Sequence, residues 1–426
     1  MWKEIKQRRD TSLNTEVLAG VISYFAIVYI IIVNSTILAD AGIPAGAAMV
    51  ATILTSAAGC FIAGFGANLP LILVPGMGVN AMFTYTFVHS MGLTWQEALG
   101  VVFVSGIVFS VIAFTPLLTT LTNAIPSTLK DAITVGLGLF LALIGLEKSH
   151  IVVPAEHSLI AFGDITSPEV ISFFLTFFIA IILFLRNVPG HFLLTIMIGT
   201  VIAWMFGAID RSQVGMGNVS VGNYADVFLG MSFEAITDVV FWVAVFALTM
   251  VLVFENIGLV YGQTKEAEQP EKYKDGIRVV AISATVSGVF GSSPTVSTAE
   301  GAAGIAAGGR TGVTAIVTGI LFLLSFFLLP FIEVIPASAI SPILIIIGFL
   351  MVLNIKNINL QDLSEAIPAF LIIMMIPFSY SIADGMAIGF LAYPIAKLAL
   401  GKGKEVSVPL YVIAGLFLVY FVSQGF

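Results

Sequence analysis

The stretch that decides the fold is Ser292-Ser293-Pro294-Thr295-Val296-Ser297-Thr298-Ala299-Glu300-Gly301, which lies between two long apolar runs. Its proline and β-branched residues favour an extended backbone. The apolar run that follows ends at Gly308-Gly309. As a helix, residues 300–308 would reach only about 13 Å, under half of the roughly 30 Å hydrocarbon core of a membrane. We therefore expect an extended segment joined to a half-helix.

A second segment of this kind occurs in the first half of the chain. Asn68-Leu69-Pro70 and Val74-Pro75-Gly76-Met77-Gly78 bracket a short apolar stretch. They predict extended backbone over residues 70–76 and a helix that starts near Gly78 or Val79. Extended backbone at membrane depth needs protein or a water-filled cavity to satisfy its polar groups. Two such segments are typical of a transporter site near the membrane midplane. Ordinary helices with Pro/Gly kinks are the alternative.

The composition assigns the chain to the membrane proteins. It has 426 residues, of which 58% are apolar and 10% are charged, whereas soluble domains carry about 25% charged residues. The high hydrophobicity excludes disorder. A net charge of -8 without a basic stripe argues against nucleic-acid binding. The single cysteine and four scattered histidines predict neither disulfides nor a metal site, and we expect no cofactor.

The apolar runs form two sets of seven, with one run left over. With the N-terminus in the cytoplasm, all but Lys148 and Arg211 of the 17 lysines and arginines fall at cytoplasmic ends. The sequence leaves open whether residues 407–424 span the membrane. We expect a cytoplasmic N-terminus (1–13), a first transmembrane set (14–208), a polar extracytoplasmic connector (209–237), a second set (238–400) and a C-terminal hydrophobic segment (401–426).

Three polar residues within apolar runs are the main site candidates, because intramembrane charge is costly. Glu255, in an otherwise uncharged helix, is a substrate ligand or proton carrier, or else a structural carboxyl paired with a neighbouring helix. Glu300 lies where the second extended segment meets its half-helix and can accept hydrogen bonds from N–H groups of a ligand. Asn80, at the matching junction, offers an amide. For Glu300 and Asn80 the alternative is a helix cap.

Structural roles are expected for two further charged residues. Asp384 is interpreted as the cap of a late helix, and Arg310 as an anchor at the lipid headgroups. The candidate site then holds carboxylates and an amide without a buried Lys or Arg. This favours a cation, or a neutral solute with N–H donors, over an anion. The chain has no nucleotide-binding loop, so we expect transport driven by an ion gradient.

Four motifs, in order along the chain, resemble those of one transporter family. The chain is similar to the nucleobase–cation symporter-2 (nucleobase–ascorbate) transporters and, among them, to the AzgA-like adenine/guanine/hypoxanthine permeases. The resemblance runs from about Thr15 to the C-terminus. The motifs are Thr15–Gly20 with Ala26–Asn34, Pro75–Ala81, Ala299–Ile305 running into Gly308–Gly312, and Pro377–Ala383.

The resemblance implies both a fold and a mechanism. The fold is all-α, with about fourteen transmembrane segments as two inverted seven-helix repeats and a core domain that moves against a gate domain. The third and tenth segments are half strand, and the purine binds between them. The resemblance also implies a homodimer and proton symport. It assigns functional positions to Asn80, Glu255 and Glu300.

These observations predict a bacterial inner-membrane transporter, not an enzyme, that imports hypoxanthine, guanine or adenine with protons. Coupling is assigned to Glu255 and Glu300. The preferred purine stays open, because the branch usually has Asp then Thr where this chain has Glu255 and Asn256, and tends to have Ser where it has Gly301. The choice of proton or sodium stays open, because a carboxylate can serve either ion. The full candidate substrate site is Glu300, Glu255, Asn80, Gly78, Met77, Ala299, Gly301 and Thr298.

Three alternatives remain at this stage. A uracil or xanthine carrier of the same superfamily is the nearest. An anion exchanger of the related sulfate-transporter class usually has a cytoplasmic domain and lacks an acid at the position of Glu300. A membrane-embedded enzyme would need an intramembrane histidine or paired acids on adjacent turns, which the apolar runs do not contain.

Overall fold

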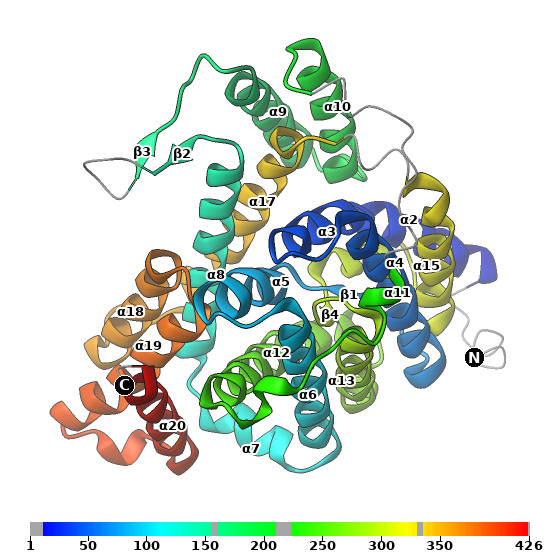
Figure 1. The fold of residues 1–426 in the computed structure, drawn as a ribbon. Helices are drawn as coiled ribbons and strands as arrows, with labels where there is room; N and C mark the ends of the chain where they lie inside the picture. Colours follow the sequence, from blue (N-terminus) through cyan, green and yellow to red (C-terminus); the bar gives the residue numbers. More distant parts are fainter. Residues whose placement is uncertain (1–11, 155–159, 210–223, 330–334, 425–426) are drawn as a thin grey trace.

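The computed structural model describes residues 12–154, 160–209, 224–329 and 335–424, which fold mainly into helices (Figure 1). Eight described spans are long and apolar enough to cross a membrane, and four shorter apolar helices accompany them. The chain is therefore a multi-pass membrane protein, as its composition predicts. Most of the expected N-terminal segment and residues 210–223 of the expected connector lie outside the described residues.

A first helix group surrounds the two extended segments. Its first span is interrupted at residues 28–29, and its remaining helices pack on one another through close contacts at small residues. The group comprises α2 (Leu13–Ile27), α3 (Ile30–Asp40), α4 (Ala45–Phe61) with the π-helix η1 (Ile62–Ala67), α6 (Trp95–Phe114), α12 (Val239–Glu266), α13 (Tyr273–Phe290) and α15 (Gly312–Leu324) with η7 (Ser325–Leu328).

A second helix group packs beside the first. Helices α8 and α17 approach closely at its centre, since a Cβ on Gly138 would lie 2.5 Å from the carbonyl oxygen of Gly348. The group comprises α8 (Ser127–Lys148), α9 (Pro168–Leu185), α10 (His191–Met205), α17 (Ala337–Val352) with η8 (Leu353–Asn357), α18 (Leu363–Ser379) and α19 (Ile382–Ala399).

Short elements and one further helix complete the described chain. Helix α20 (Val408–Gln424) corresponds to the left-over apolar run and contacts α19 of the second group, α12 of the first group and the short helix α7. The short elements are α7 (Leu117–Ala124), β2 (Val152–Val153), β3 (Ala161–Phe162), α11 (Tyr224–Val227), η4 (Glu234–Thr237), η5 (Pro270–Lys272) and η9 (Gly403–Glu405).

Both extended segments expected from the sequence are strands, and they meet. Figure 1 shows β1 (Leu73–Pro75) and β4 (Thr295–Ser297) side by side at the centre of the molecule. They pair antiparallel, with Val74 opposite Val296. β1 leads into α5 (Met77–Ala81) and the π-helix η2 (Met82–Ser90), and β4 into η6 (Ala299–Gly301) and α14 (Ala302–Ala306). The alternative of two kinked continuous helices is wrong, and the first short helix starts at Met77, one residue before Gly78.

Side chains of neighbouring helices satisfy the backbone of β4. The amide of Ser297 donates to Asn256 Oδ1 of α12 at 2.8 Å. The amide of Thr295 donates to Ser287 Oγ of α13 at 3.0 Å. Unpaired backbone groups at membrane depth would cost several kcal/mol each. These polar residues therefore allow a strand to persist inside an otherwise apolar bundle.

The structure corrects the role expected for Asp384. The cap of α19 is Ser381, whose Oγ accepts the amide of Asp384 at 3.2 Å. The guanidinium of Arg310 donates to the carbonyl oxygens of Ile305 and Gly309, the latter at 2.9 Å. Ile305 lies in the last turn of α14, where unpaired carbonyls attract cations. Arg310 therefore contacts the end of α14, and its expected place at the lipid headgroups stays a prediction.

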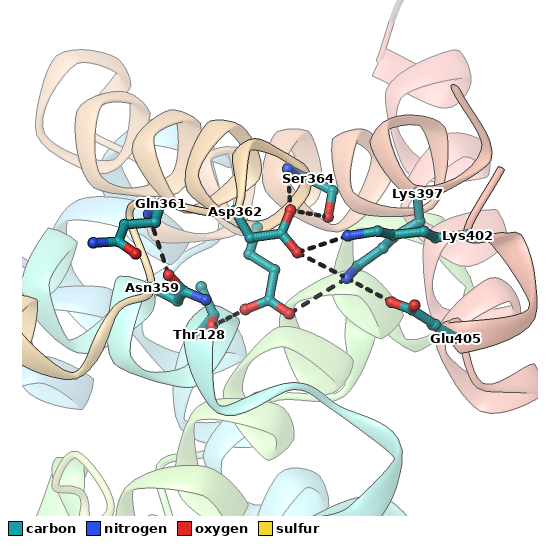
Figure 2. Close-up of polar contacts among 9 residues, drawn as sticks. Thr128, Asn359, Gln361, Asp362, Ser364, Lys397, Lys402 and Glu405 are labelled. Carbon is teal, nitrogen blue, oxygen red and sulfur yellow. Dashed lines mark hydrogen bonds and ion pairs between the residues drawn. The ribbon is translucent and has the colours of Figure 1, made fainter. Parts of the chain in front are cut away.

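An ion network joins one end of the second helix group (Figure 2). Lys397 near the end of α19 is only 3% exposed, and its Nζ lies 3.4 Å from Glu365 Oε1. Thr128 at the start of α8 donates to Glu365 Oε2 at 2.6 Å. Lys402 Nζ lies 3.0 Å from Asp362 Oδ2. The network therefore ties α8, α18 and α19 together at this end.

Candidate substrate site

One cavity of about 490 Å³ lies between the two helix groups, beside β1 and β4. Helices α8 and α17 line it from the second group, and α12 with the two discontinuous segments from the first. Its size suits a small organic solute, for which pockets typically measure about 300–1,000 Å³. Six of the eight sequence-predicted site residues line this cavity, namely Glu300, Glu255, Gly78, Met77, Ala299 and Thr298.

The other two predicted residues, Asn80 and Gly301, are buried and are not among the residues that line the cavity. Asn80 lies within α5, where its Nδ2 is 3.5 Å from the carbonyl oxygen of Asn34. Its Oδ1 has no hydrogen-bond partner among the described residues. A Cβ on Gly301 would lie 3.4 Å from the Cβ of Ile72, which is ordinary contact. Asn80 and Gly301 therefore lie next to residues of the cavity wall without facing the cavity.

Glu300 is held by a residue that the sequence did not single out. The hydroxyl of Tyr29 donates to Glu300 Oε1 at 2.6 Å, a distance typical of a hydrogen bond to a charged acceptor. No described residue donates to the other carboxylate oxygen, Oε2. The expected alternative, a cap of its own helix, is not observed: η6 begins after Thr298 without a side-chain cap.

Glu255 lies on α12 and lines the same cavity. Its Oε2 is enclosed and has no hydrogen-bond partner among the described residues. Among the described residues this oxygen therefore shows no pairing with a neighbouring helix. Buried polar atoms normally have partners, so this unpaired oxygen is a candidate contact for a bound ligand.

Amides on α12 hold the strand that presents Thr298, and the sequence did not identify their role. Gln263 Nε2 donates to the carbonyl oxygen of Thr298 at 2.6 Å. Ser297 Oγ donates to Gln263 Oε1 at 2.5 Å. The hydroxyl of Thr298 is buried without a partner in the described residues, although its residue lines the cavity. The site therefore has an unpaired hydroxyl in addition to two carboxylates.

The cavity lies toward one end of α8. Lys130 lines it, whereas Lys148, eighteen residues or about 27 Å further along the helix, does not. There Lys148 Nζ pairs with Asp40 Oδ2 of α3 at 2.6 Å, and Tyr85 of η2 donates to the same oxygen at 2.6 Å. The two helix groups are thus joined at the end opposite the cavity. The described residues contain no cluster of three His, Cys, Asp or Glu that could hold a metal.

The discontinuous segments and the cavity between two helix groups are an arrangement typical of membrane transporters. Comparison with known proteins agrees, since residues 14–388 match a family described as "Permease family". The chain belongs to this family, the nucleobase–ascorbate transporters that its motifs predict.

Two curated relatives and one solved structure illustrate the likeness. The nucleobase transporter PlAzg2 of Paenibacillus larvae is 49% identical over 89% of this chain and 76% of its own. The guanine/hypoxanthine permease PbuO of Bacillus subtilis is 35% identical over 97% and 98%. The transmembrane domain of the cyanobacterium bicarbonate transporter BicA has a TM-score of 0.63 at 16% identity, covering 91% of this chain and 97% of that one. At this identity the match to BicA shows a shared fold alone.

Proposed function

We propose that this protein imports the purine nucleobases hypoxanthine, guanine or adenine by proton symport. It would do so across the bacterial cytoplasmic membrane, with its N-terminus in the cytoplasm. The observation that carries the proposal is that Glu255 and Glu300 line one cavity beside the paired strands. The names of the relatives PlAzg2 and PbuO support a nucleobase as the substrate class.

The polar groups of the cavity complement a purine base. Purines carry ring and exocyclic N–H groups, which need acceptors, and Glu300 Oε2 is an acceptor without a donor among the described residues. The hydroxyl of Thr298 can donate or accept as the base requires. Met77, Gly78 and Ala299 supply the shape of the wall, and Asn80 and Gly301 support it. Glu300 is therefore the principal base ligand in this proposal.

Coupling to protons is assigned first to Glu255. Its enclosed Oε2 has no partner among the described residues, so a proton bound there would neutralise a carboxylate that nothing else compensates. Protonation also removes a charge from the membrane interior, where a charged side chain costs about 2.5–3.5 kcal/mol on insertion scales. Glu300 takes part in the coupling, because it binds the base in the same cavity while Glu255 carries the proton. A proton gradient then drives the base inward.

The transport cycle is proposed to move the first helix group, as the core, against the second, as the gate. The paired β1 and β4, each followed by a short helix, support fourteen transmembrane segments in two inverted repeats. In this proposal the cavity at the Ser127 end of α8 faces the cytoplasm, and Asp40 with Lys148 closes the outer end; the ion pair at the other end of α8 supports this assignment. We assign the working form as a homodimer in the lipid bilayer, by the family resemblance.

A transport assay tests this proposal. The purified full chain is reconstituted into proteoliposomes with an imposed inward proton gradient and no sodium, and offered labelled hypoxanthine, guanine, adenine, xanthine and uracil in parallel. We expect accumulation of at least one of the first three, abolished by a protonophore. Uptake of only uracil or xanthine would overturn the purine assignment, and accumulation that requires sodium would overturn the proton. Uptake of no base would reject the function.

A further inference from the structure

Tyr29 occupies a special place in the fold. It lies at the interruption between α2 and α3, lines the substrate cavity, and is only 1% exposed. Its hydroxyl donates to Glu300 Oε1 at 2.6 Å across 271 residues of sequence. Its ring packs edge-to-face on Phe192 of α10, with centroids 4.9 Å apart and an interplanar angle of 65°. Tyr29 therefore touches the first helix group through Glu300 and the second through Phe192.

We propose that Tyr29 is a positioning residue for nucleobase recognition, which orients Glu300 so that Oε2 meets an N–H group of the base. This inference rests on the proposed function and adds a determinant of affinity to it. The terminal torsion of a glutamate is broad, so a carboxylate without a fixed neighbour samples many orientations. A short hydrogen bond to Oε1 restricts that rotation. The binding site is then preorganised before the base arrives.

The orientation of Tyr29 is itself fixed from the other side. An edge-to-face contact holds the ring at a defined angle, and Phe192 belongs to the second helix group. The Tyr29 hydroxyl therefore points at Glu300 when the first and second helix groups are packed together as in this conformation. Recognition of the base by Glu300 is consequently strongest in this conformation, which links occupancy of the site to the relative position of the groups.

Replacing Tyr29 by Phe isolates the hydroxyl, because the ring and its contact with Phe192 remain. The matched control is Tyr24→Phe. Tyr24 lies on the same span, its hydroxyl is 2.7 Å from Ser325 Oγ, and it does not line the cavity. Binding of labelled hypoxanthine, guanine and adenine to the purified full chain is measured together with thermal unfolding and the KM and maximal rate of uptake.

We expect Tyr29→Phe to raise the Kd and KM of the bound base about tenfold, or about 1.4 kcal/mol. The unfolding midpoint should stay at the wild-type value and the maximal rate within about twofold, because the fold and the moving groups are intact. Tyr24→Phe should leave Kd, KM and the maximal rate within about twofold of wild type and the unfolding midpoint unchanged. If Tyr29 only stabilised the fold, Tyr29→Phe would lower the unfolding midpoint and the maximal rate together, and Kd would not be the quantity that changes most.

Two results would overturn the inference. One is a Kd in Tyr29→Phe equal to that of wild type. The other is a rise in Kd that is not specific, because the unfolding midpoint of Tyr29→Phe falls as well or because Tyr24→Phe shows the same rise in Kd. If the wild-type protein binds and takes up a base, such a result rejects the role of Tyr29 and leaves the proposed function standing. If the wild-type protein neither binds nor transports any base, the proposed function fails, and the role of Tyr29 fails with it.

Discussion

Removing the contact between Asp40 and Lys148 should populate a conformation that is open at the far end of the cavity. The contact joins α3 to α8 with a 2.6 Å separation, and its side chains are 32% and 17% exposed. Fully exposed ion pairs contribute about 0.2–1 kcal/mol. Partial burial and the short contact between two charged groups raise the expected contribution to about 1–2 kcal/mol. Asp40→Asn should therefore raise the population of the other conformation about 5- to 30-fold.

Thiol labelling measures this population. Cys60, the chain's one cysteine, is buried and is replaced by Ser. The reporter is Thr86→Cys, because Thr86 is fully buried and its hydroxyl accepts the amide of Ile382 in the second helix group. A membrane-impermeant reagent should label this cysteine when the groups separate at that end. While the open form is rare, the labelling rate is proportional to its population, so it should rise about 5- to 30-fold in Asp40→Asn.

The matched control is a pair within one helix. Asp275 and Arg278 of α13 are 2.9 Å apart and 53% and 38% exposed. Because this pair does not join the helix groups, Asp275→Asn should leave the labelling rate unchanged. A labelling rate in Asp40→Asn equal to that of the parent would refute the reasoning. So would an equal rise in both variants.

Two further predictions concern stability. Gly304→Ala should lower the unfolding midpoint and weaken base binding, because its Cβ would overlap Ser23 Oγ and displace α14 at a cost of about 1–3 kcal/mol. Ser23→Ala in the same chain should recover part of the loss, since the carbonyl oxygen of Ala19 would still lie 2.8 Å from that Cβ, and no recovery would contradict this steric cause. Hydrogen bonds from Ser364 and from Lys402 hold the pKa of Asp362 below its usual value. Its stabilising effect is therefore complete at neutral pH and lost as the pH falls through the lowered pKa. Asp362→Asn should lower the unfolding midpoint at pH 7, and its difference from wild type should shrink in acid. A difference in midpoint that does not depend on pH would contradict this role of the Asp362 carboxylate.

Local chemistry explains why the discontinuous segments could be predicted. Pro75 and Pro294 cannot continue a hydrogen-bonded helix, and Gly76 next to Pro75 accepts other conformations, so short windows of sequence contain the information. The interruption at residues 28–29 has no such signal. It lies inside the continuous apolar span Leu13–Asp40, and the sequence gives no proline or glycine there.

Long-range contacts explain what the sequence could not predict in the site. Tyr29 is one aromatic residue in an apolar run until the fold brings it to Glu300. The same holds for Gln263, whose partners Ser297 and Thr298, at the end of β4 and directly after it, lie 34 and 35 residues further along the chain. Glu16 is at the edge of its apolar run, where an acid is usually exposed, yet it is fully buried and accepts the hydroxyl of Thr314 at 2.6 Å. A sequence signal for these residues would have been a polar atom in an apolar run, but this criterion selects many side chains that merely bond to their own helix.

The most direct test of the account is concentrative uptake by Glu255→Gln, with Glu266→Gln as the control. Glu266 is an exposed residue at the end of the same helix and does not line the cavity. With one proton per base, each pH unit of an inward gradient supports up to about tenfold accumulation. Wild type and Glu266→Gln should approach this ratio in proteoliposomes. Glu255→Gln should bring the internal base concentration no higher than the external one. If Glu255→Gln accumulates base as strongly as wild type, Glu255 is not the proton carrier and the central claim is wrong.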